Sequence, residues 1–67
     1  MLGAAHPSTL TARASLAQST GEAGDAGGAR DQFAILLPLT EQVLGSAHPS
    51  TLIARASLAY WTGESQP

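Results

Sequence analysis

The chain has 67 residues, with three arginines and no lysine against five acidic side chains, a formal net charge of −2 and no cysteine. This length allows one small domain, and the missing cysteines exclude disulfide scaffolds and cysteine-ligated zinc sites. A mildly acidic chain without lysine is poorly suited to nucleic acid, and no apolar run approaches the roughly 20 residues of a membrane span. The first residues lack the basic and apolar regions of a signal peptide, so we expect a cytoplasmic protein without membrane contact.

The first predicted helix runs from Ser8 to about Ala23 and follows a start signal at residues 6–9, His-Pro-Ser-Thr. Proline at the first helical position loses no hydrogen bond, and hydroxyl side chains in the first turn can satisfy free N–H groups. The apolar and small residues recur at spacings of three and four and form two rows, Leu10, Ala14 and Ala17, and Ala12 and Leu16. Two such rows predict a helix that packs on two sides.

The second predicted helix runs from about Ala26 to Leu44, after a turn and N-cap at Gly24–Asp25. Its apolar row consists of Ala26, Ala29, Phe33, Leu36, Leu37, Thr40, Val43 and Leu44. Glycines in the first turn weaken the helix, and Pro38 removes the hydrogen bond to Ala34, so we expect a kink or break over residues 34–37. Gly45 is the expected C-terminal glycine.

The third predicted helix runs from about Ser50 to Ser65, with a frayed end at residues 66–67, and it is a copy of the first. When residues 1–25 are laid over residues 43–67, 17 of the 25 positions are identical. No segment shows the alternating pattern of a strand. The sequence therefore predicts an all-α, helix-turn-helix repeat, a fragment of an α-solenoid with three helices. We interpret residues 1–67 as one module, with a first repeat at 1–42 and a partial second repeat at 43–67.

The repeat resembles a tetratricopeptide repeat of the roughly 42-residue kinesin-light-chain type, a variant common in actinobacterial multi-repeat proteins. The matching segments are Leu-Gly-x-x-His-Pro-x-Thr-Leu at 2–10 and 44–52, Arg-x-x-Leu-Ala at 13–17 and 55–59, Gly-Asp-x-x-x-Ala-x-x-x-Phe at 24–33, and Ala-Tyr-Trp-Thr-Gly-Glu at 59–64. The resemblance covers essentially the whole chain. It implies that the first helix of each repeat lines a groove that binds a peptide or protein.

The candidate binding residues in such a groove are Arg13, Ser15, Arg55 and Ser57. The two arginines occupy equivalent positions and can present cations to an acidic peptide; the alternative is that each pairs with a neighbouring carboxylate or lies over the next helix. Family members commonly carry asparagine between the arginine and the Leu-Ala pair. Here those positions hold Ala-Ser, which leaves a hydroxyl in place of an amide.

A second candidate surface lies on the third helix, at Leu52, Tyr60 and Trp61. In a longer array these side chains would pack on a following helix, so here we expect them to form an association surface. The alternative is that the aromatic rings fold back onto the second helix.

Neither catalysis nor cofactor binding is expected. His6 and His48 are a whole repeat apart and lack nearby acidic partners, so we interpret them as structural residues at the corner between repeats. The glycines at 21–28 lack the lysine of a phosphate-binding loop and are interpreted as turn and helix-end residues. The five acidic residues are scattered, which indicates solvated surface.

We therefore expect a non-enzymatic protein-interaction module, with a protein or peptide partner and no cofactor, metal or nucleic acid. The alternative is a structural unit that self-associates through the open face of its last helix. Solenoids normally need about three repeats for stability, and an alanine-rich core buries little apolar area. We thus expect the monomer to be marginally stable, and the chain to be either part of a longer array or a self-associating homo-oligomer.

Overall fold

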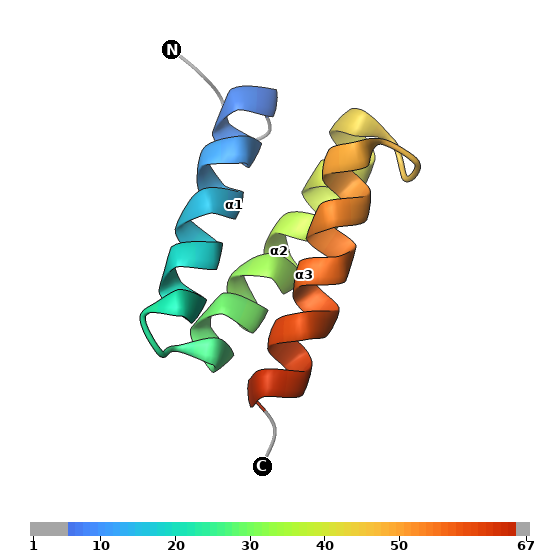
Figure 1. Cartoon of the computed structure of the whole chain (residues 1–67). Helices are drawn as coiled ribbons and strands as arrows, with labels where there is room; N and C mark the ends of the chain where they lie inside the picture. The colour runs from blue at the N-terminus through green and yellow to red at the C-terminus, as the bar shows by residue number, and fades with distance from the viewer. Residues whose placement is uncertain (1–5, 66–67) are drawn as a thin grey trace.

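The computed structural model describes residues 6–65 and contains three helices, α1 (Pro7–Glu22), α2 (Ala26–Leu44) and α3 (Pro49–Ser65). α1 and α3 run in the same direction, and α2 runs antiparallel to both (Figure 1). The part of the chain from 6 to 65 contains no strand. The all-α prediction with three helices is confirmed, and each predicted boundary lies within one residue of the observed one. The predicted frayed end at 66–67, like residues 1–5 of the first copy, lies outside the described residues.

α1 and α3 begin with the same cap, and this cap uses an imidazole. Nδ1 of His6 accepts a hydrogen bond from the backbone N–H of Ser8 at 3.1 Å, and Nδ1 of His48 accepts one from Ser50 at 3.0 Å. A proline follows each histidine at the first helical position. The predicted starts are confirmed, and the histidine side chain performs the capping that the sequence analysis assigned to hydroxyl groups.

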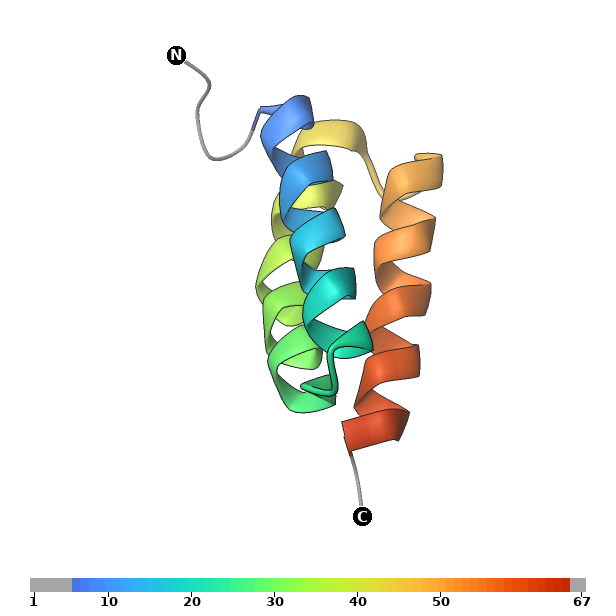
Figure 2. The same ribbon diagram turned by 60° about the vertical axis from the view of Figure 1, so that its left-hand side comes forward.

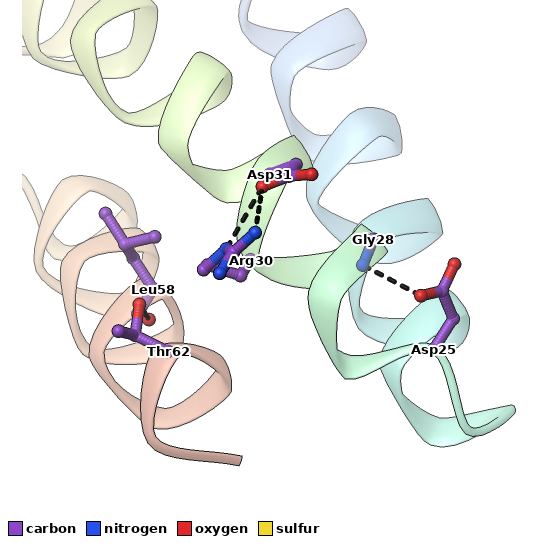
Figure 3. Close-up of polar contacts among 6 residues, drawn as sticks. All are labelled: Asp25, Gly28, Arg30, Asp31, Leu58 and Thr62. Carbon is purple, nitrogen blue, oxygen red and sulfur yellow. Dashed lines mark hydrogen bonds and ion pairs between the residues drawn. The ribbon is translucent and has the colours of Figure 1, made fainter. Parts of the chain in front are cut away.

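The turn between α1 and α2 contains the predicted turn glycine and the predicted N-cap residue. Gly24 has a φ of 105°, a backbone conformation that favours glycine. Oδ1 of Asp25 accepts a hydrogen bond from the backbone N–H of Gly28 at 2.9 Å (Figure 3). At the other end of α2, Gly45 has a φ of 90° and donates its N–H to the carbonyl of Glu41 at 2.9 Å. Both helix-end predictions are therefore confirmed.

α2 continues through Pro38 as one helix, so of the kink or break expected over residues 34–37 the break is absent. Pro38 itself is exposed, whereas Leu36 and Thr40 on either side are buried. The hydroxyl of Thr40 donates to the carbonyl of Leu36 at 3.0 Å. The buried face on both sides of the proline holds α2 together despite the missing backbone hydrogen bond.

The core lies along α2, which packs against both α1 and α3 (Figure 1). Phe33 is its largest fully buried side chain. The apolar core consists of Leu10, Ala17, Ala29, Phe33, Leu36, Ala54 and Trp61. None of the described helices is both long and apolar enough to cross a membrane.

Candidate functional site

A groove of about 650 Å³ lies between α1 and α3, with α2 as its floor. Both walls belong to the two repeated helices. The lining residues are Leu10, Thr11, Ala14, Ser15, Gln18 and Ser19 from α1, Phe33, Leu36, Thr40 and Leu44 from α2, and Ser50, Ile53, Ala54 and Ser57 from α3. The wall side chains are mostly small or hydroxylated, and the floor is mostly apolar.

The described lining of the groove contains no charged side chain. Its polar groups are hydroxyls and the amide of Gln18, which can exchange hydrogen bonds with a peptide backbone. Ile53 is an exposed aliphatic side chain on the α3 wall. The chemistry of the groove therefore suits an uncharged, partly apolar segment.

The C-terminal halves of α1 and α3 approach each other (Figure 2), and Trp61 joins them. Its Nε1–H donates to Oε1 of Gln18 at 3.1 Å. The ring also lies against Gly21, where a β-carbon would come within 2.5 Å of it. Trp61 therefore fixes the spacing of the two groove walls at this end.

The structure separates the predicted binding residues. Ser15 and Ser57 line the groove on opposite walls, whereas Arg13 and Arg55 do not line it. Nη2 of Arg55 forms an ion pair with Oε2 of Glu41 on α2 at 2.7 Å, which is the alternative considered for the arginines. The structure therefore places two of the four predicted residues, Ser15 and Ser57, in the groove, and their part in binding stays a prediction.

Arg13 lies instead beside a smaller hollow of about 220 Å³ on the seam between α1 and α2. The other residues that line it are Leu16, Gln32, Ile35 and Leu36. Within residues 6–65 the Arg13 side chain forms no ion pair or hydrogen bond. Arg30, the third arginine, pairs with its neighbour Asp31 at 2.8 Å (Figure 3).

The predicted association surface is only partly exposed. Leu52 and Tyr60 are exposed, at 50% and 58%, but Trp61 is 6% exposed and belongs to the core. Its inclusion in an exposed surface is therefore wrong, because it packs on Gly21 of α1 rather than on a following helix. The Tyr60 ring meets the Trp61 ring edge to face, with centroids 4.7 Å apart.

Most of the groove lining was not predicted from the sequence, notably Thr11, Gln18, Ser50 and Ile53. Helical spacing could have identified these residues, because side chains three, four or seven positions from a groove serine lie on the same face of its helix. Thr11 and Gln18 lie four and three positions from Ser15. Ser50 and Ile53 lie seven and four positions before Ser57.

Within residues 6–65 no group of three or more histidine or carboxylate side chains is placed to hold a metal ion. Both histidines use Nδ1 in helix capping, which fits the structural role expected for them. Comparison of the chain with family models, curated proteins and solved structures found no match.

Proposed function

We propose that this chain is a non-enzymatic protein-interaction module of the tetratricopeptide type whose α1–α3 groove binds a peptide segment of a cytoplasmic partner. The observation that supports this most directly is the groove itself, which has hydroxyl-bearing walls and an apolar floor. The two walls are the helices that repeat in the sequence, and the equivalent residues Ser15 and Ser57 line the groove on opposite sides.

The lining also determines which kind of peptide fits. Charged side chains are missing from the described lining, and Arg55 is held by Glu41. An acidic peptide therefore finds no charge-assisted partner there. We expect an uncharged segment that places an apolar side chain beside Ile53 and its backbone near Ser15 and Ser57.

Selection of random peptides on the immobilised chain, followed by titration of the selected peptides, tests this function. Ile53→Asp places a charge in the groove, and Leu52→Asp is its matched control, because Leu52 is also exposed but lies outside the groove lining. We expect selected peptides to bind the parent chain and Leu52→Asp equally and to lose at least about tenfold in affinity for Ile53→Asp. The reverse pattern contradicts groove binding.

Self-association is a second candidate, and exposed Leu52 and Tyr60 favour it. A self-associating unit gains mass and helicity with its own concentration. Light scattering and circular dichroism over a hundredfold concentration range test this, with Leu52→Asp expected to abolish any concentration dependence. A monomer of constant helicity throughout contradicts it.

A further inference from the structure

The repeated helix uses opposite faces in its two copies. Leu10 and Ala17 of α1 are buried beneath α2, whereas the identical positions in α3, Leu52 and Ala59, are exposed. The exposed fraction is 3% for Leu10 and 50% for Leu52. The same side chains are therefore covered by a helix in one copy and left open in the other.

On the other face of the repeated helix the burial is reversed, because α3 is covered there and α1 is exposed. Ala54 of α3 is buried and Leu58 packs against the core, whereas the identical residues in α1, Ala12 and Leu16, are exposed. Leu16 is 63% exposed. α1 therefore presents an open copy of the face that α2 covers on α3.

The open face of α1 consists of Ala12, Arg13 and Leu16. Ala12 and Leu16 make it apolar, and Arg13 adds one positive charge. Ile35 of α2, 65% exposed, extends it across the seam. Arg13 has no described partner there, and Arg13 and Ile35 both line a hollow of about 220 Å³. Two exposed aliphatic side chains beside an unpaired guanidinium make a surface that suits an amphipathic, acidic partner.

The copy of this face on α3, which α2 covers, shows which kind of partner fits the open copy on α1. On α3 the antiparallel helix α2 (Figure 1) lies over Ala54 and Leu58. Its Glu41 pairs with Arg55 at 2.7 Å. Arg55 and Arg13 occupy the same position in the repeated helix. A helix that covers α1 in the same way therefore brings a carboxylate to Arg13.

We propose that this face of α1 docks an amphipathic helix of a partner protein, with aliphatic side chains over Ala12 and Leu16 and a carboxylate paired with Arg13. The site is separate from the proposed peptide groove, because Ala12, Arg13 and Leu16 are not among the groove residues. Charge complementarity and the Glu41–Arg55 pair identify the partner as acidic and helical.

A fluorescently labelled peptide of residues 25–45 is the probe, because it carries the helix that covers the equivalent face on α3. A second peptide with Pro38→Ala raises its helicity and reduces the ordering that binding requires. We expect saturable binding of both peptides to the full-length chain, measured by fluorescence anisotropy. Leu16→Asp removes the apolar contact and is expected to abolish binding.

Arg13→Glu is expected to weaken binding roughly five- to tenfold. A peptide with Glu41→Arg is expected to prefer the Arg13→Glu chain over the parent chain, which a loss of folding cannot produce. Arg30→Glu is the matched control for net charge, since Arg30 lies on α2 and pairs with Asp31.

Any one of four results overturns the proposal. Three are absence of binding by either peptide, equal weakening by Arg13→Glu and Arg30→Glu, and loss of binding with Leu52→Asp, which places the peptide on the open face of α3. Loss of binding with Ile53→Asp places the peptide in the groove, which overturns this proposal and leaves the proposed function standing.

Discussion

Trp61 lies directly over Gly21, so that the last helix contacts the first at the one position where α1 has no side chain. A β-carbon on Gly21 would come within 2.5 to 2.6 Å of three atoms of the indole ring. The ring is held there by its hydrogen bond to Gln18. The position equivalent to Gly21 in the second copy, Gly63, has no atom within 4 Å of such a carbon.

Gly21→Ala is expected to destabilise the fold by about 1–3 kcal/mol, because the indole must leave its packed position. This loss exceeds the gain of at most about 1 kcal/mol that alanine brings to a helix interior. Gly63→Ala is the matched control and is expected to stabilise by up to about 1 kcal/mol. Urea unfolding followed by circular dichroism measures both changes, and equal effects of the two substitutions would refute the packing argument.

The hydrogen bond between Trp61 and Gln18 is expected to contribute about 0.5–1.5 kcal/mol to the free energy of unfolding. Trp61→Phe and Gln18→Leu, made singly and together, isolate this interaction from the lost ring area. A coupling free energy near zero would show that the two side chains act independently. The indole fluorescence of Gln18→Leu reports whether Trp61 stays buried.

Pro38→Ala is expected to stabilise the chain by about 1–3 kcal/mol. Alanine restores the backbone N–H that proline lacks and relieves the clash with the preceding turn. Pro38 is exposed, so no buried contact is lost. Thermal unfolding should show a higher midpoint, and an unchanged or lower midpoint would indicate that α2 accommodates proline without cost.

His48→Ala is expected to cost about 1 kcal/mol, because the backbone N–H of Ser50 loses its acceptor. His48→Asn supplies another side-chain acceptor at the cap and should retain most of the stability. Urea unfolding of the two variants tests the cap, and a loss as large for asparagine as for alanine would assign the histidine a different role.

The local features of the chain could be predicted from its sequence. The start of α1 and α3 at proline, the cap at Asp25 and the ends at Gly24 and Gly45 each depend on the backbone preferences of one or two residues. The 3.6-residue period of apolar side chains predicted three helices for the same reason, since it reflects neighbours within one turn.

Only the tertiary structure decided which faces of these helices are used. Arg13 and Arg55 occupy equivalent positions in the sequence, yet α2 supplies Glu41 to Arg55 alone. Trp61 is buried because it reaches across to Gly21, 40 residues earlier in the chain. Residues with identical local sequence therefore differ in burial, charge pairing and availability for binding, because these depend on which helix lies opposite each face.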